Sequence, residues 1–226
     1  MVEVYLYLSK QKILQLSEQS PSFWRGVAAK LDFKFPFVSG GIAGQHQSSL
    51  TSELHRLIPQ LHHQFNIPAA ENVIKMDSPP VLFTFRGSAA RQVEDDQFWL
   101  AMECGKTALL LGGSASNVIG SSSAGAKISP SIDPVGAIQF LLEKREEPRD
   151  IENDDQVSPS FDLSYLWQAL MTPSLKSSMV LPFVEGIAVF STRLPTHPEQ
   201  LKRIKRSELT TMLVGTPLYV RQVESL

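Results

Sequence analysis

The stretch from Gly112 to Gly125 holds the residues whose types and spacing come closest to a ligand site. It contains four glycines and five serines, and it follows three leucines that are typical of the end of a buried strand. Backbone N–H groups of such a loop can approach a ligand closely, because glycine has no side chain in the way. We therefore expect a ligand cradle, with a lysine to meet an anion; the alternative is a plain surface loop kept flexible by its composition. The expected ligand-binding residues are Gly112, Gly113, Ser114, Ser116, Asn117, Gly120 and Lys127.

The same stretch resembles half of the nucleophile elbow of serine hydrolases. The elbow follows the pattern Gly-x-Ser-x-Gly, and here Ser116 stands in the place of the second glycine. A hydrolase with Ser114 or Ser116 as nucleophile would also need a histidine and an acid, for which His197 with Glu199, or His46, could serve. A hydrolase acting at the loop is the alternative to a binding site, and the sequence leaves open whether the protein is an enzyme. We assign no catalytic residue.

Three histidines lie close together in the sequence, but their spacing argues against a metal site. His55 and His62 are seven residues apart, which separates them by about 10 Å along a helix. The positions between them at ligating spacing are Ile58 and Pro59, which cannot bind a metal. We predict no metal ligand, and a solvated helix flank accounts for the histidines.

The segment Cys104–Thr107 ends like a phosphate-binding P-loop but lacks the glycine four residues before the Gly-Lys pair. Both flanks are typical of strands, so we predict a hairpin that turns at Gly105 and Lys106. Cys104 is the one cysteine of the chain, and its apolar strand predicts a buried, unreactive thiol.

Composition and charge exclude several classes of protein. The net charge is −2 over 226 residues, which gives no general attraction to nucleic acid or anionic membranes. A single cysteine rules out an intrachain disulfide, and no apolar run reaches the length of a membrane helix. We expect a cytoplasmic protein with no membrane contact, no nucleic-acid partner and no cofactor. One basic cluster comprises Lys202, Arg203, Lys205 and Arg206. It is typical of a solvated face or of a contact for an acidic protein partner, and it could also pair with the acidic insertion of the same chain.

Helices and strands are mixed without regular alternation, which favours an α+β fold over a doubly wound sheet. Strands are expected at 2–8, 33–37, 81–86, 98–104, 107–111, 183–192 and 209–220, the last interrupted at Gly215–Pro217. Helices are expected at 10–19, after Pro21, from Ser48 to Phe65 with a kink at Pro59, after Pro134, at 163–170 and around 196–206. We predict one domain over residues 1–226, with a single mixed or mainly antiparallel sheet of about six or seven strands and packed helices. Residues 145–159 are expected to form a flexible acidic insertion.

Three short motifs together resemble an uncharacterised bacterial protein family. They are the opening Tyr5–Ser9, the central Leu111–Gly120 and the closing Leu213–Val220. The resemblance spans the chain and supplies no activity. It implies that the three motifs meet in one structure, with the first and last strands side by side and the glycine-serine loop at their ends. It also implies a place in a bacterial conflict or anti-phage system.

These observations favour a non-enzymatic module that binds or senses a small, anionic or nucleotide-like molecule at the Gly112–Gly125 loop. Such a module would pass its ligand-bound state to a protein partner. The alternatives are the hydrolase described above and a purely structural interaction protein that uses its basic cluster and acidic insertion for contacts.

Overall fold

The computed structural model describes residues 3–18, 47–94, 97–119, 159–176, 182–202 and 204–224. Four predictions lie outside these ranges: the helix after Pro21, the strand at 33–37, the helix after Pro134 and, except for Pro159, the acidic insertion at 145–159. Nearly all other predicted elements are present.

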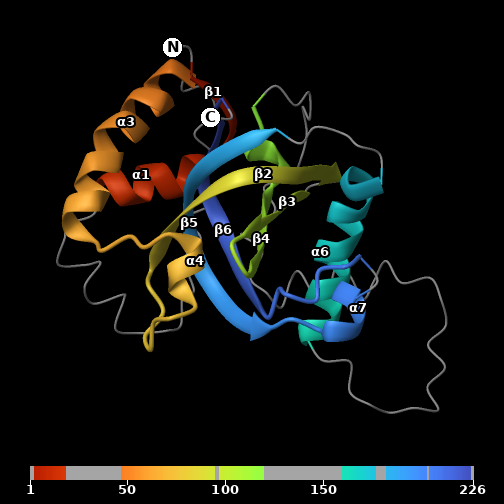
Figure 1. Cartoon of the computed structure of the whole chain (residues 1–226). Helices are drawn as coiled ribbons and strands as arrows, with labels where there is room; N and C mark the ends of the chain where they lie inside the picture. The colour runs from red at the N-terminus through yellow and green to blue at the C-terminus, as the bar shows by residue number, and fades with distance from the viewer. Residues whose placement is uncertain are drawn as a thin grey trace.

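The described strands form one six-stranded sheet, in the order β1-β6-β4-β3-β2-β5 (Figure 1). All neighbouring pairs are antiparallel except β4 and β6, which are parallel. The strands are β1 (Val4–Leu8), β2 (Leu82–Glu94), β3 (Gln97–Cys104), β4 (Thr107–Ser114), β5 (Phe183–Pro195) and β6 (Thr211–Gln222).

The sheet closes on itself because β5 also pairs with β6, so that β2, β3, β4, β6 and β5 form a barrel. Closure depends on β2, which pairs with β5 through residues 82–88 and with β3 through residues 89–94. The change of partner falls at Gly87, whose φ of 158° is accessible mainly to glycine. We predicted a single mixed or mainly antiparallel sheet, without its closure, and a loop at 87–97. The polar residues there are instead the far half of a strand, because the barrel buries only the small Ala89 and Ala90.

The first strand enters the sheet beside the last, as the family resemblance implies. β1 is antiparallel to the end of β6, and its other side meets the segment that follows β4 through a bridge from Tyr7 to Val118. The backbone N–H of Ile119 also donates to the carbonyl of Leu6 at 3.0 Å. β1 thus fills the gap where β4 and β6 part. The predicted interruption at Gly215–Pro217 is wrong: β6 is continuous and accommodates Pro217 with a register shift against β5.

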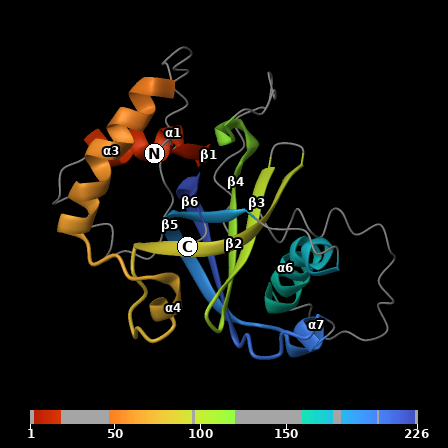
Figure 2. The ribbon, with the colours of Figure 1, turned by 45° about the horizontal axis from the view of Figure 1, so that its top comes forward.

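Helices cover opposite sides of the barrel, as both views show (Figures 1 and 2). On one side α1 and α3 pack on β1, β5 and β6 through a cluster that includes Leu54, Leu57 and Tyr219. On the other, α6 and α7 pack on β3 and β4 around Trp99 and Trp167. The short α4 contributes to the barrel interior. The helices are α1 (Lys10–Glu18), α3 (Gln47–Gln64), α4 (Ala70–Val73), α6 (Pro159–Lys176) and α7 (Pro198–Lys202).

Side chains that alternate along the strands separate the barrel interior from these two outer layers. On β3, Phe98, Leu100 and Met102 point inward, whereas Trp99 and Ala101 point toward α6. The fold is therefore α+β as predicted, but its sheet is a closed barrel with α6 between the third and fourth barrel strands. This connectivity is that of the five-stranded Greek-key barrel of the OB type.

Candidate functional site

A pocket of about 620 Å³ lies between α3 and the outer surface of the barrel, with α4 at one end. Its volume falls within the range of roughly 300–1,000 Å³ that is usual for small-molecule sites. Five of its lining residues are formally charged, which distinguishes it from the apolar packing elsewhere under α3. They are Glu3, Glu71, Arg86, Glu185 and Arg221.

Strand register places three of these side chains in a row. Arg86 on β2 is directly opposite Glu185 on β5, and Glu185 is directly opposite Arg221 on β6. Tyr5 on β1 is in turn opposite Arg221. Side chains at facing positions of neighbouring strands point to the same side of a sheet. The row therefore crosses four strands on the surface that faces α3.

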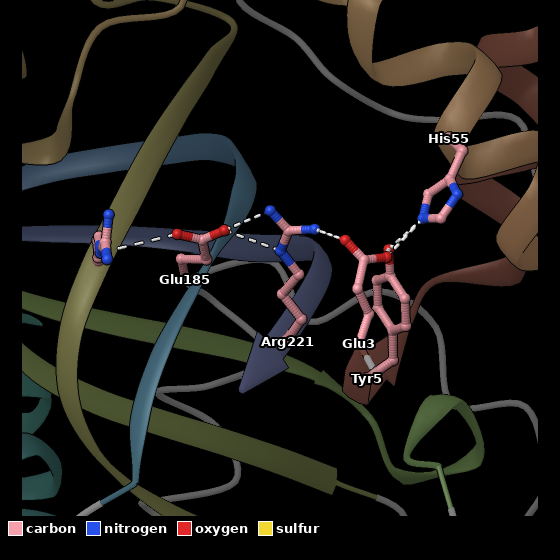
Figure 3. Close-up of polar contacts among 6 residues, drawn as sticks. Glu3, Tyr5, His55, Glu185 and Arg221 are labelled. Carbon is pink, nitrogen blue, oxygen red and sulfur yellow. Dashed lines mark hydrogen bonds and ion pairs between the residues drawn. The ribbon is translucent and has the colours of Figure 1, made fainter. Parts of the chain in front are cut away.

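Arg221 is the centre of this charged row (Figure 3). Its Nε donates to Glu185 Oε1 at 2.8 Å, and its Nη2 donates to the same oxygen at 2.5 Å. Its Nη1 donates to Glu3 Oε1. Arg221 and Glu185 expose only 26% and 20% of their side chains, so these charges are partly shielded from water. One guanidinium thus holds together two carboxylates that are far apart in the sequence, Glu3 before β1 and Glu185 on β5.

Glu3 also receives hydrogen bonds from the side toward α3 (Figure 3). The Tyr5 hydroxyl donates to Glu3 Oε2 at 3.0 Å, and His55 Nε2 lies 2.7 Å from the same oxygen. His55 Nε2 lies 2.9 Å from the Tyr5 hydroxyl as well. With Nε2 protonated, His55 donates to Glu3 and fastens α3 to β1. We predicted a solvated flank for His55; the side chain is 51% exposed, yet it belongs to this network.

The surroundings set the protonation of the network. Burial raises the pKa of Glu3, but hydrogen bonds from Tyr5 and His55 and the charge of Arg221 outweigh it, and the pKa is lowered overall. Burial and the hydrogen bond to Glu3 raise the pKa of Tyr5 to about 12. Burial lowers the pKa of Arg221, but Glu185 and Glu3 more than compensate and raise it. At neutral pH the network therefore contains an ionised Glu3, a charged Arg221 and a neutral Tyr5 phenol.

Cys104 lies at the end of the pocket near Arg86 and Glu71. Its sulfur is hydrogen-bonded to the backbone of Arg86, and the side chain is 6% exposed. Burial, reinforced by the negative charge of Glu71, raises the pKa of the Cys104 thiol to about 12. The predicted buried thiol is confirmed, and its surroundings keep it protonated.

The residues predicted to form the ligand cradle are placed differently. Gly112, Gly113 and Ser114 belong to β4, which runs three residues beyond its expected end at Leu111. Gly112 and Gly113 leave room for aromatic rings, because a Cβ on Gly112 would lie 2.9 Å from Trp99 and one on Gly113 would overlap the hydroxyl of Tyr7. These two glycines serve close packing in the sheet, which is why a strand continues where the composition indicates a loop.

The rest of the predicted cradle divides into two parts. Ser116 and Asn117 form a 3-10 turn (Ala115–Asn117), in which Ser116 is exposed and the Asn117 amide donates to the Tyr7 hydroxyl at 3.2 Å. Gly120 and Lys127 lie outside the described residues. The described part of the cradle does not line the pocket under α3.

The hydrolase alternative does not gain a base from the described residues. Ser114 Oγ lies 2.8 Å from Ser116 Oγ, so each hydroxyl contacts the other. His197 comes two residues after Pro195, the last residue of β5. Pro195 pairs with Thr211 of β6, and Thr211 pairs with Thr107, the first residue of β4. Seven residues of strand, about 23 Å, separate Thr107 from Ser114. His197 therefore cannot activate either serine, and His46 lies outside the described residues.

The remaining predictions concern metal, membrane and the basic cluster. Among the described residues, no three His, Cys, Asp or Glu side chains are grouped to hold one metal ion, and no helix is long and apolar enough to cross a membrane. In the basic cluster, Arg206 Nε donates to Glu103 Oε1 at 2.6 Å, which ties this arginine to β3. Arg203 lies outside the described residues.

Sequence reasoning missed Arg86, Glu185 and Arg221. The sequence signal that could have found them is a charged residue inside or at the end of each apolar strand. Such a residue indicates that one face of the strand carries a polar group. Reading it required the register between strands that are far apart in the sequence.

Fold and site together define a small closed β-barrel, flanked by helices on two sides, with a charged pocket between the barrel and α3. Residues 3–224 match the Family of unknown function (DUF7019), and the chain belongs to this family. This agrees with the resemblance to an uncharacterised family. No curated protein and no solved structure matches the chain.

Proposed function

We propose that the protein is a non-enzymatic module that binds a small molecule in the pocket between α3 and the barrel. The observation that carries the proposal is the convergence of charged side chains from α4 and three strands on one cavity of ligand size. The site moves from the Gly112–Gly125 loop to this pocket, because Gly112 and Gly113 pack against aromatic rings.

The chemistry of the pocket favours binding over turnover. Cys104 is the one thiol of the chain, and burial raises its pKa to about 12, so it is a poor nucleophile at neutral pH. His55 is engaged by Glu3 and Tyr5. The carboxylates of Glu3 and Glu185 neutralise Arg221, which suits a rigid pocket wall better than a reacting group.

The barrel also argues against a nucleic-acid module. OB-type barrels bind oligonucleotides on the face of their second and third strands. Here these strands are β3 and β4, and their outer side chains, such as Trp99 and Leu110, are buried with Leu163 and Trp167 of α6. A fold-level comparison carries no function by itself, but the usual surface is covered.

The position of the pocket beside α3 provides a route by which ligand binding would be communicated to a protein partner. One wall belongs to α3 and the opposite wall to the barrel, so a ligand that contacts both would bias the packing of α3. The outward face of α3 carries exposed polar residues such as Glu53 and Arg56. We propose this face as the surface that a protein partner reads.

The test is ligand binding with a variant that fills the pocket. Pro59 lines the pocket from inside α3, where a proline costs helix stability, so Pro59→Trp fills the space without removing a needed contact. Gln60→Trp places the same ring on the next, exposed residue and is the matched control. We would screen nucleotides, cyclic nucleotides, amino acids and their derivatives by thermal shift and confirm hits by calorimetry.

Pro59→Trp should abolish binding of any hit, and Gln60→Trp should preserve it. A ligand that binds equally to both tryptophan variants would place the site elsewhere and reject the proposal.

A further inference from the structure

The side chains around the pocket divide into those that already have partners and those that remain available. Arg221 is shared between Glu185 and Glu3, and Glu3 is further held by Tyr5 and His55. These groups form a closed set in which each charge meets an opposite charge or a hydrogen-bond donor. A ligand would have to break strong contacts to use them.

Two groups of opposite charge are left for a ligand. Arg86 Nε lies 3.7 Å from Glu185 Oε2, beyond hydrogen-bond distance, and the Arg86 guanidinium carbon lies 5.6 Å from the centre of the Phe183 ring, while 49% of the Arg86 side chain is exposed. Glu71 is exposed, and within the described part of the chain its carboxylate forms no ion pair or hydrogen bond. Both residues line the pocket.

Arg86, Glu71 and Cys104 all line the pocket. The Cys104 sulfur is hydrogen-bonded to the backbone of Arg86, and the charge of Glu71 acts on the same thiol. Glu71 Cβ lies 3.7 Å from the position of a Cβ on the adjacent Gly105. Within the described residues no ion pair joins Arg86 to Glu71, and both side chains line the same pocket. That arrangement leaves a guanidinium and a carboxylate facing one cavity.

We propose that the pocket recognises a small zwitterion, whose anionic group binds Arg86 and whose cationic group binds Glu71. This inference rests on the proposed function and names its ligand class. Ile58, Pro59 and Phe85 supply an apolar wall between α3 and β2, which suits a hydrocarbon or aromatic portion of the ligand. An amino acid with an apolar side chain, or a molecule of that chemistry, meets all three requirements.

Charge balance disfavours the multiply charged anion suggested by the sequence. The lining contains three carboxylates, Glu3, Glu71 and Glu185, against two guanidiniums, Arg86 and Arg221. A nucleotide phosphate at Arg86 would face this excess of negative charge at short range, where burial weakens screening. A zwitterion adds no net charge and satisfies both available groups.

The experiment compares ligands that differ only in charge. Phenylalanine carries both charges, its amide carries only the positive one, 3-phenylpropanoate carries only the negative one, and adenosine monophosphate represents the multiply charged anions. The twenty free amino acids and glycine betaine extend the zwitterions to other side chains. Calorimetry on the full chain should show a zwitterion bound about ten-fold or more tightly than its two singly charged analogues, since a hydrogen-bonded charge contributes roughly 1.5–3 kcal/mol.

Two substitutions assign the two charges. Glu71→Gln should reduce the best zwitterion to the affinity of its anionic analogue, and Arg86→Gln should reduce it to that of its amide. Arg91→Gln, on the same strand and exposed, and Glu208→Gln, exposed before β6, are the matched controls and should leave affinity unchanged. Both pocket residues are exposed, so the variants should fold, which circular dichroism would verify.

Each other outcome decides a specific point. If 3-phenylpropanoate or adenosine monophosphate binds at least as tightly as the zwitterions, and Pro59→Trp abolishes it, the zwitterion inference is overturned while the proposed function stands. Equal binding of a zwitterion to wild type and Glu71→Gln likewise rejects the assigned cationic subsite. If no member of the panel binds, both the inference and the proposed function fail.

Discussion

The hydroxyl of Tyr7 occupies the space that a side chain on Gly113 would need. A Cβ at Gly113 would overlap this oxygen and approach Cζ to 2.9 Å. Tyr7 is fully buried and stacks on Phe98 with ring centroids 4.8 Å apart. Position 113 therefore requires glycine because the ring of Tyr7 on β1, more than a hundred residues earlier in the sequence, fills the space beside it.

Gly113→Ala should lower the free energy of unfolding by about 1–3 kcal/mol, the usual cost of an added carbon in a packed core. Urea denaturation measures the change. A double-mutant cycle with Tyr7→Phe tests the cause, because removing the hydroxyl relieves the worst overlap and should recover part of the loss. If the two changes are simply additive, the steric explanation is wrong and Gly113 has another role.

Local elements were predictable because their signals lie within a few residues. The hairpin at Gly105 is confirmed, with a φ of 60° at that glycine, and so is the long helix around Leu54 and Leu57. Period and turn chemistry suffice for such elements. The end of β4 was placed too early because Gly112 and Gly113 indicate a loop by composition, but the sheet uses them as strand residues beside large rings.

Barrel closure and the pocket were not predictable because both depend on long-range register. Glu3 and Arg221 are separated by 218 positions and form an ion pair only when β1 lies beside the end of β6. The family resemblance implied that the chain ends meet, and the structure brings these strands together. It did not indicate that Arg86 and Glu185 would continue the row, since that requires β2 and β5 to pair as well.

Glu3→Gln should reduce stability in a manner that depends on pH. The folded protein lowers the pKa of Glu3 from 4.5, so the ionised form is favoured on folding and its contribution is present above pH 4.5. That contribution is lost as the pH falls through the lowered pKa. Glu3 is 36% exposed, so the effect at neutral pH should be only about 0.2–1 kcal/mol.

Urea denaturation of wild type and Glu3→Gln at pH 7 and at pH 3 measures this difference. The two proteins should differ at pH 7 and converge at the lower pH. Glu53→Gln, which removes an exposed carboxylate paired with Arg56 on α3, controls for loss of a surface ion pair. A gap between wild type and Glu3→Gln that widens in acid would contradict the assigned network.

Cys104 should react very slowly with iodoacetamide in the folded protein. Burial raises the pKa of its thiol to about 12, so only a very small fraction of the thiol is thiolate at neutral pH. Mass spectrometry of the alkylated protein gives the rate, and unfolding in urea should restore that of an ordinary thiol. Fast alkylation in native buffer would show that the pocket end is open and the thiolate accessible.

Arg193 should hold α4 in place at the end of the barrel. Its Nη1 donates to the backbone carbonyls of Val73, Ile74 and Met76 at 3.0–3.2 Å, at and beyond the end of this short helix, where the Val73 carbonyl also accepts the N–H of Met76 at 3.2 Å. Arg193→Ala leaves these carbonyls to water and should cost about 1–3 kcal/mol of stability. Arg193→Lys, whose ammonium lacks the planar fork, should recover only part of it.

Hydrogen exchange distinguishes a local role of Arg193 from a global one. Amides of residues 70–76 should exchange faster in Arg193→Ala, whereas those of β3 and β4 should lose protection only as far as overall stability falls. Arg91→Ala, also exposed on a barrel strand, should leave 70–76 unchanged. Because Glu71 lies in α4, the same variant should weaken any ligand held by that carboxylate, and calorimetry would detect the loss. Uniform loss of protection across the barrel would mean that Arg193 supports the strands, and the anchoring of α4 would need another explanation.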